Sequence, residues 1–267
     1  GVGLSIHGKY RVATENTIFA MPETKIGLFP DVGGTWWIPR LKLYRDRQRK
    51  GVVGGVGNYL ALTGARLKGD DLIYAGIATH FIPSERLNEL KLALIDATNN
   101  STQSLGDCVA GVLMSFHDEK VNVDLDKAFL SKNRKEIDQA FDGKQSVEDI
   151  VSTLESVKSD SQFAKTTLDT LKQMSPTSLK VTLEALIRGS KVQSIEEALD
   201  MEYRMSQAFM RKGSDFYEGI RAALVDKCGE PQWNPSSLEG VTNGFVDKFF
   251  DDLGDRELCL SGGSSKL

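Results

Sequence analysis

The chain has 267 residues, of which 40 % are hydrophobic and 26 % are charged, with a net charge of −4 and a pI of about 5.6. This composition is typical of a globular protein with a core of ordinary size. The charge balance gives no reason to expect a nucleic-acid partner, and no apolar run reaches the roughly 18 residues of a membrane-spanning helix.

Cysteine and histidine are scarce and scattered. The cysteines are Cys108, Cys228 and Cys259. Their odd number and wide spacing argue against a disulfide framework or a zinc site and fit a reducing compartment. His7, His80 and His117 show no metal-ligand spacing, so we expect surface or locally hydrogen-bonded side chains. We therefore expect no metal and no cofactor.

The first 41 residues alternate short helix and strand signals. The glycine-rich stretch from Gly1 predicts a helix start whose free N–H groups could face a developing negative charge. The stretches KYRVAT and TIFAMP predict strands, the second ending at Pro22. The stretch DVGGTWWIPRL predicts a helix with Asp31 as its N-cap, which Pro39 keeps short or kinked.

Residues 43–57 are basic and then glycine-rich, which favours a solvated flexible loop over a phosphate-contacting one. Helix signals follow up to Gly64, and again from Asp70 and Asp71 to Gly76. The stretch IATHFI then predicts a strand.

After about Glu85 the pattern is mainly helical. Ser146, Ser175 before a proline, and Ser194 predict helix N-termini, and Ser194-Ile-Glu-Glu reads as a full capping box. Asp215 predicts a further helix start. Residues 117–150 are polar and predict an exposed helical insert. Buried helix faces are expected at Leu179, Leu183 and Leu186, and at Ala198, Met201 and Met205.

Two carboxylates in FAMPETKIGLFPDVGGTWW follow prolines, and they are the candidates for chemistry. Glu23 stands at the end of an apolar strand, where partial desolvation would raise its pKa and make it a usable base or nucleophile. Asp31 is either a helix cap or a second catalytic group. Gly33 and Gly34 permit a tight turn or a close approach of the backbone to another group.

The stretch VATENTIFAMPETKIGLFPDVGGTWWIPRL resembles the enoyl-CoA hydratase/isomerase (crotonase) superfamily, and MPET…GLFPDVGG resembles its branch that hydrolyses CoA thioesters. LALTGARLKGDDLIYAGIATHF, MSPTSLKVTLEAL and DFYEGIRAALVDK extend the match over nearly the whole chain, except residues 43–53 and the tail.

The resemblance implies an α/β fold: a crotonase-like spiral of ββα units followed by a mainly α-helical C-terminal region. On this pattern residues 1–90 form the C-terminal part of the spiral, residues 91–250 the helical region and residues 251–267 a flexible tail. The spiral is expected to be incomplete at the N-terminus. The helical region implies a possible homo-oligomer or a cover over the site.

The resemblance also implies roles for individual residues. Glu23 matches the glutamate that attacks the thioester carbonyl or activates water, and Asp31 matches the aspartate that binds the substrate hydroxyl or orients water. Gly1, Gly3, Pro30 and Gly33 are the implied substrate-binding positions. Gly3 stands where hydratases carry a second glutamate, and this favours hydrolysis over hydration.

The implied function is hydrolysis of a short-chain 3-hydroxyacyl-CoA, with 3-hydroxyisobutyryl-CoA of valine catabolism as the leading substrate. One alternative is an enoyl-CoA hydratase or isomerase. Another is an inactive fragment, because the N-terminal third of the family pattern, with both oxyanion-hole donors, is expected to be missing. The resemblance implies the mitochondrial matrix, whereas the C-terminal Ser265-Lys266-Leu267 matches a peroxisomal address.

Overall fold

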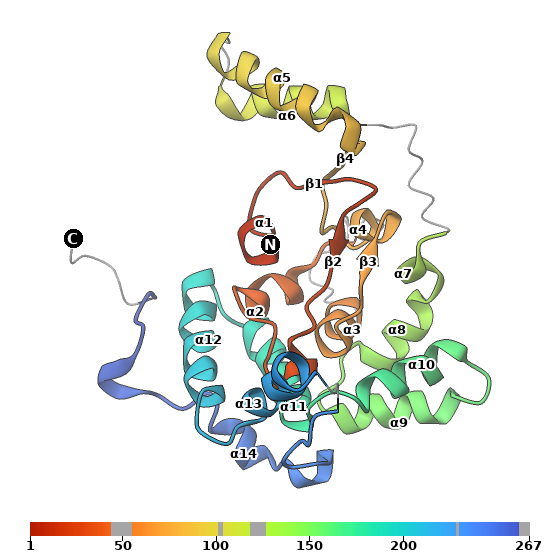
Figure 1. Ribbon diagram of the computed structural model, residues 1–267, viewed down its shortest axis with the longest axis vertical. Coiled ribbons are helices and arrows are strands. Elements are labelled where there is room, and N and C mark those ends of the chain that lie inside the picture. The colour runs from red at the N-terminus through yellow and green to blue at the C-terminus, as the bar shows by residue number, and fades with distance from the viewer. Residues whose placement is uncertain (44–54, 101–103, 118–126, 228–229, 262–267) are drawn as a thin grey trace. The chain divides into compact units, whose positions relative to one another are not determined.

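A computed structural model describes residues 1–43, 55–100, 104–117, 127–227 and 230–261 (Figure 1). Residues 44–54 of the predicted basic loop, Cys228 and the C-terminal Ser265-Lys266-Leu267 lie outside these residues. The loop prediction is wrong for residues 55–57, which form the buried start of helix α3 (Gly55–Thr63). Within the described ranges, no helix combines the length and hydrophobicity that crossing a bilayer requires.

The chain forms two compact units that interleave along the sequence. The first comprises residues 1–19, 42–50 and 66–132, and the second comprises residues 20–41, 51–65 and 133–267. The boundary near residue 90 that the family pattern suggested stays a prediction.

The first unit holds all four strands found in the described residues, and each strand is two residues long. β1 pairs in parallel with β4, placing Val12 opposite His80, and β2 pairs antiparallel with β3, placing Phe19 opposite Leu67. The strands expected in KYRVAT, TIFAMP and IATHFI are thereby confirmed. The elements are α1 (Val2–Ser5), β1 (Val12–Ala13), β2 (Ile18–Phe19), β3 (Leu67–Lys68), α4 (Asp70–Tyr74) and β4 (His80–Phe81).

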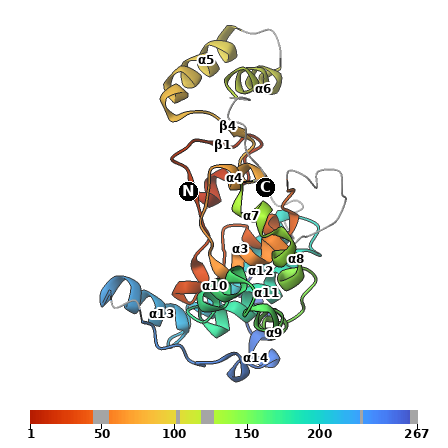
Figure 2. The same ribbon diagram turned by 90° about the vertical axis from the view of Figure 1, so that its right-hand side faces the viewer.

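A helical hairpin follows β4. After a 3-10 turn at Ser84–Arg86, α5 (Leu87–Asn100) and α6 (Leu105–Phe116) lie side by side (Figure 2). They enclose a small apolar cluster that includes Ile82 and Phe116. The last helix of this unit, α7 (Phe129–Lys132), begins where the Asp71 carboxylate accepts the N–H groups of its first two residues.

His80 and His117 are locally bonded, as the sequence indicated. His80 Nδ1 lies 2.8 Å from the Thr79 hydroxyl, and His117 Nδ1 accepts the Phe81 N–H at 3.1 Å. The two rings meet edge to face with their centroids 5.6 Å apart. Burial is the main cause of a lowered pKa of His80, and the neighbouring His117 lowers it further.

The second unit is built from helices wherever the structure describes it. Serines begin several of these helices, as predicted: Ser146, Ser175 and Ser194 each accept the backbone N–H three residues ahead. The helices are η1 (Glu23–Ile26), α2 (Gly34–Trp37), η2 (Ile38–Arg40), α3 (Gly55–Thr63), α8 (Arg134–Phe141), α9 (Val147–Val157), α10 (Gln162–Leu171), α11 (Pro176–Gly189), α12 (Ile195–Phe209), α13 (Asp215–Ile220), η5 (a π-helix, Arg221–Val225), η6 (Leu238–Gly240), α14 (Asn243–Asp247) and η7 (Gly254–Arg256).

Two capping details differ from the prediction. The capping box at Ser194 is only half formed, because the Glu197 carboxylate accepts the N–H of Gln193 instead of that of Ser194. The helix start predicted at Asp215 is confirmed, because α13 begins there, but its N-cap is Ser214 and the Asp215 carboxylate accepts the Ser175 hydroxyl at 2.5 Å. Asp215 stands one residue after the cap, and its buried carboxylate also accepts the Asn234 N–H at 2.9 Å.

The prediction that residues 117–150 form an exposed insert is wrong for the part that the structure describes. Ile137 and Phe141 are fully buried, and α8 packs on α3, where the Phe141 ring meets Tyr59 edge to face at 5.5 Å. Apolar residues at positions 137, 140 and 141 form a helical stripe that the surrounding charges obscure in the sequence.

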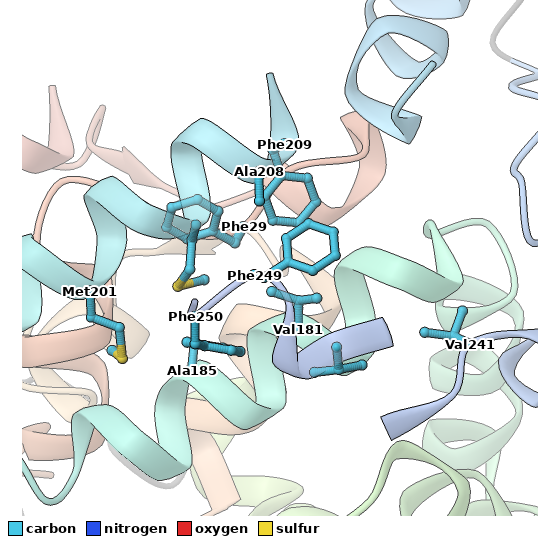
Figure 3. Packing of buried hydrophobic residues seen from close by; sticks show 11 residues of the cluster. Phe29, Val181, Ala185, Met201, Ala208, Phe209, Val241, Phe249 and Phe250 are labelled. Carbon is cyan, nitrogen blue, oxygen red and sulfur yellow. The ribbon is translucent and has the colours of Figure 1, made fainter. Parts of the chain in front are cut away.

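The main core of this unit surrounds a phenylalanine from the segment that joins the two candidate carboxylates. Phe29 is fully buried and stacks on Phe209 of α12 with centroids 5.6 Å apart (Figure 3). Met201 and Met205 belong to the same cluster, which confirms their expected place in the core. Burying a side chain the size of Phe29 contributes about 2 kcal/mol, so the core fixes the backbone between Glu23 and Asp31.

Candidate active site

Glu23 opens a 3-10 turn and does not end a strand, which corrects the sequence prediction. β2 ends at Phe19, and η1 begins at Glu23 with Pro22 as its N-cap. Gly27 ends the turn in the left-handed region at φ 71°, so that the Leu28 N–H returns to the Glu23 carbonyl at 3.0 Å. The proline and the glycine thus set the backbone on each side of the carboxylate.

Helix α13 packs directly on this turn. A Cβ atom at Gly27 would lie 2.3 Å from the Asp215 carbonyl oxygen, and one at Gly219 would lie 2.2 Å from the Ile26 carbonyl oxygen. Only glycine permits such backbone approaches. Thr24 also holds the turn by two hydrogen bonds. Its carbonyl accepts the Ser175 N–H at 3.2 Å, and its hydroxyl donates to the Leu62 carbonyl at 3.2 Å.

The Glu23 carboxylate is held in this rigid frame without a hydrogen-bond partner on one oxygen. Oε2 is buried and unpaired, although the side chain as a whole is half-buried. Burial raises the pKa of Glu23 to about 7, and the negative charge of Asp31 adds to the rise. The structure therefore brings the two predicted carboxylates close enough for one to perturb the ionisation of the other.

Asp31 lies half-buried at the start of a strained turn. Val32 has φ 51°, which is rare for a β-branched residue, and Gly33 follows with φ 83°. The Asp31 carbonyl accepts the Gly34 N–H at 2.9 Å and closes the turn. Burial raises the pKa of the Asp31 carboxyl.

The helix-capping alternative for Asp31 is wrong. Helix α2 begins at Gly34, and its N-cap is Gly33, which has no side chain to cap it. Asp31 stands two residues before this cap, too early to reach the first N–H groups of the helix. Its carboxylate is therefore not consumed by the helix end.

Another carboxylate takes that place, and the sequence reading missed it. Glu202 of α12 is 4 % exposed and accepts the N–H groups of Gly33 at 2.8 Å and Thr35 at 2.9 Å, as well as the Thr35 hydroxyl at 2.8 Å. Burial raises the pKa of Glu202. A signal existed: Glu202 lies one helical turn from Ala198 and from Met205, so it interrupts the apolar face of the helix.

A small pocket opens beside Glu23 and has a volume of about 250 Å³. Its walls come from η1, from α13 and from the π-helix η5, and they are mostly apolar. Single-turn π-helical segments often occur at functional sites. The lining residues are Pro22, Glu23, Lys25, Ile26, Gln173, Gly219, Ala222, Ala223 and Pro231.

The other predicted site residues divide between the units. Pro30 and Gly33 flank Asp31 in the second unit, and the Gly33 N–H already bonds within the protein. Gly1 and Gly3 belong to the first unit. A substrate-binding role for these four residues stays a prediction. Among the described residues, no group of three or more His, Cys, Asp or Glu side chains could hold a metal ion.

Comparison with known proteins gives consistent matches. The sequence profile of the enoyl-CoA hydratase/isomerase family matches residues 1–250. A mitochondrial 3-hydroxyisobutyryl-CoA hydrolase of Danio rerio is 46 % identical over 261 residues, which are 97 % of this chain and 63 % of the relative. The Homo sapiens protein of the same name is 46 % identical over 259 residues, 97 % of this chain and 62 % of the relative. This chain thus spans about 62–63 % of their length.

Solved structures agree with the expected fold. A carnitinyl-CoA dehydratase from Mycobacterium thermoresistibile superposes with a TM-score of 0.79 at 35 % identity, covering 98 % of this chain and 66 % of that one. An enoyl-CoA hydratase from Rhodobacter sphaeroides superposes with a TM-score of 0.76 at 33 % identity, covering 96 % and 66 %. The α/β crotonase-like fold with a helical C-terminal region is confirmed.

Because burial raises the pKa of Glu23, replacing this residue should stabilise the protein by an amount that depends on pH. A carboxyl with a raised pKa binds its proton more tightly in the folded protein, so it lowers stability as pH rises from about 4.5 to about 7. Glu23→Gln should therefore raise the free energy of unfolding by about 1–3 kcal/mol at pH 8, and by progressively less toward pH 4.5. Urea unfolding at several pH values measures this, with Glu196→Gln on the exposed face of α12 as control. A difference in the free energy of unfolding that does not change with pH would contradict the raised pKa of Glu23.

Proposed function

Because this chain belongs to the enoyl-CoA hydratase/isomerase family, we propose that it carries the catalytic carboxylates of an acyl-CoA thioester hydrolase that acts on 3-hydroxyisobutyryl-CoA in valine catabolism. The relatives' names supply the substrate. The observation that carries the chemistry is Glu23, a half-buried carboxylate with one buried, unpaired oxygen and a pKa of about 7. An oxygen that no protein group satisfies is available to a substrate or a water molecule.

Glu23 can cleave the thioester in two ways, and both need its ionised form. In the first, the carboxylate attacks the carbonyl carbon, the C–S bond breaks and CoA leaves as a thiolate that takes a proton from solvent. Water then hydrolyses the mixed anhydride and restores Glu23. In the second, Glu23 accepts a proton from the water that attacks the carbonyl; the C–S bond of the resulting tetrahedral intermediate then breaks, and the departing CoA thiolate takes the proton from Glu23. A pKa near 7 makes the carboxylate more basic than an ordinary glutamate while leaving about half of it ionised at neutral pH.

Asp31 has the position and charge for a supporting role. Its half-buried carboxylate lies near enough to Glu23 to raise the pKa of that group. As an acceptor it can bind the 3-hydroxyl of the substrate or orient the attacking water. Either role would place the reacting carbonyl relative to Glu23.

The pocket beside Glu23 suits the small acyl group. Its volume of about 250 Å³ is below that of sites for drug-sized ligands. Gly219 and Ala222 line it and, because both residues are small, leave this space open. A short branched acyl chain can fill such a space with its methyl group against apolar residues. Longer acyl chains would meet the π-helix.

Thioester hydrolysis should depend on the charge of Glu23. In the full-length protein, Glu23→Gln should lower kcat/KM for 3-hydroxyisobutyryl-CoA by at least about 100-fold, whereas Glu196→Gln should leave it unchanged. In the unmodified protein, kcat/KM should fall as pH drops below about 7, because the protonated carboxyl cannot attack or accept a proton. Release of CoA, followed with a thiol reagent, measures both effects.

Equal rates for the Glu23→Gln and unmodified proteins would exclude Glu23 from the reaction. The same assay separates hydrolysis from hydration. A hydratase would consume the double bond of crotonyl-CoA, seen as a loss of ultraviolet absorbance, without releasing a thiol.

Narrowing the pocket should discriminate between acyl groups. Ala222→Leu should lower kcat/KM for 3-hydroxyisobutyryl-CoA by about tenfold or more and affect acetyl-CoA less, because the added side chain occupies the space of the branched acyl group. Leu224→Ala is the matched control, since Leu224 lies on the same π-helix and is 64 % exposed. Equal losses for the two substrates would remove this pocket from the acyl site.

We propose that the protein acts in the mitochondrial matrix, since its relatives are named mitochondrial. Replacement of the C-terminal Ser265-Lys266-Leu267 should then leave its location unchanged, because a matrix protein does not need that tripeptide. Fluorescence imaging of the full-length protein with an internal tag measures this. Loss of a peroxisomal signal on replacement would favour the peroxisome instead.

A further inference from the structure

We propose that Glu202 is a positioning residue that holds the turn bearing Asp31 in the geometry required for hydrolysis. The proposal rests on the function proposed above for Asp31. It is carried by the contacts of a buried carboxylate with the backbone that directly follows Asp31.

Both oxygens of Glu202 are used on this turn. Oε2 accepts the Gly33 N–H at 2.8 Å, and Oε1 accepts the Thr35 N–H at 2.9 Å and the Thr35 hydroxyl at 2.8 Å. The side chain is 4 % exposed, so water does not compete for these bonds. Charge-assisted bonds in a dry site are both strong and directional.

The turn needs such a clamp because its backbone is strained. Val32, with φ 51°, and Gly33, with φ 83°, both lie in the left-handed region, which a β-branched residue adopts only under constraint. Asp31 directly precedes this pair, and its carbonyl closes the turn onto Gly34. If the Glu202 bonds are lost, relaxation at Val32 would rotate the peptide that carries the Asp31 side chain.

The same helix provides an internal comparison. Asp200 is also buried, at 6 % exposed, and its carboxylate accepts the N–H groups of Leu260 and Ser261 and the Ser261 hydroxyl. Asp200 and Glu202 therefore make the same kind of three-bond clamp from neighbouring positions of α12. Only the Glu202 clamp ends on the Asp31 turn.

Glu202→Gln keeps the size of the side chain and places an NH₂ group where one oxygen accepted an N–H. Two donors then face each other, and at least one of the three bonds is lost. We expect kcat/KM for 3-hydroxyisobutyryl-CoA in the full-length protein to fall by about tenfold or more. Asp200→Asn should lower the melting temperature without this loss of activity.

A double-mutant cycle tests whether Glu202 acts through Asp31. Asp31→Asn alone should lower kcat/KM, and the double variant with Glu202→Gln should be no slower than Asp31→Asn alone. If Glu202→Gln does not fold, Thr35→Val removes only the hydroxyl bond and should show the same non-additive pattern with a smaller loss.

The outcomes separate this inference from the proposed function. Two results would overturn the positioning role alone. In the first, the losses of kcat/KM in the two single variants multiply in the double variant. In the second, Glu202→Gln and Thr35→Val keep full activity while Asp31→Asn is impaired. Full activity of Asp31→Asn would overturn both the positioning role and the function proposed for Asp31. An equal loss of activity in Asp200→Asn would reduce Glu202 to a general contribution to folding.

Discussion

The architecture of this site depends on one constraint: a Glu23 carboxylate oxygen is kept buried without a hydrogen-bond partner. A buried acceptor without a partner lowers stability, and the chain would relax away from it if the backbone allowed. The contacts around η1 prevent this. Gly27 and Gly219 bring α13 into backbone contact with the turn. Thr24 hydrogen-bonds to the backbone of Leu62 and of Ser175. The packing of the surrounding helices thus holds the Glu23 carboxylate in an unfavourable environment, which is common in active sites.

Glu23 and Glu202 show two opposite solutions for a buried carboxylate in one unit of the fold. Burial raises the pKa of both groups. Glu202 is compensated by three hydrogen bonds from one turn, so its charge serves to hold backbone in place. Glu23 has an oxygen without any bond, so its charge remains available for chemistry. Asp31 lies between these cases, half-buried beside the clamped backbone and close enough to Glu23 to shift its pKa.

Much of the local structure follows from the sequence because it depends on neighbours along the chain. Ser146, Ser175 and Ser194 begin helices as predicted, and the short strands lie where β-forming residues stand between turn signals. The errors share a cause. Neither the Asp31 nor the Asp215 side chain caps a helix, although α13 does begin at Asp215, because partners far away in sequence decide what each carboxylate does. For Asp215 that partner is the Ser175 hydroxyl, 40 positions away.

The sequence by itself determined the family, the pair of candidate carboxylates and the helical nature of the C-terminal region, because motifs, caps and periodicity are encoded in residues close together. Only the tertiary structure decided that Glu23 opens a turn with an unpaired oxygen, that its pKa rises to about 7, and that Glu202 bonds to the backbone after Asp31. Burial and long-range hydrogen bonds depend on which segments meet in space. Glu202 meets Gly33 across 169 residues of chain, and no local pattern specifies such a contact.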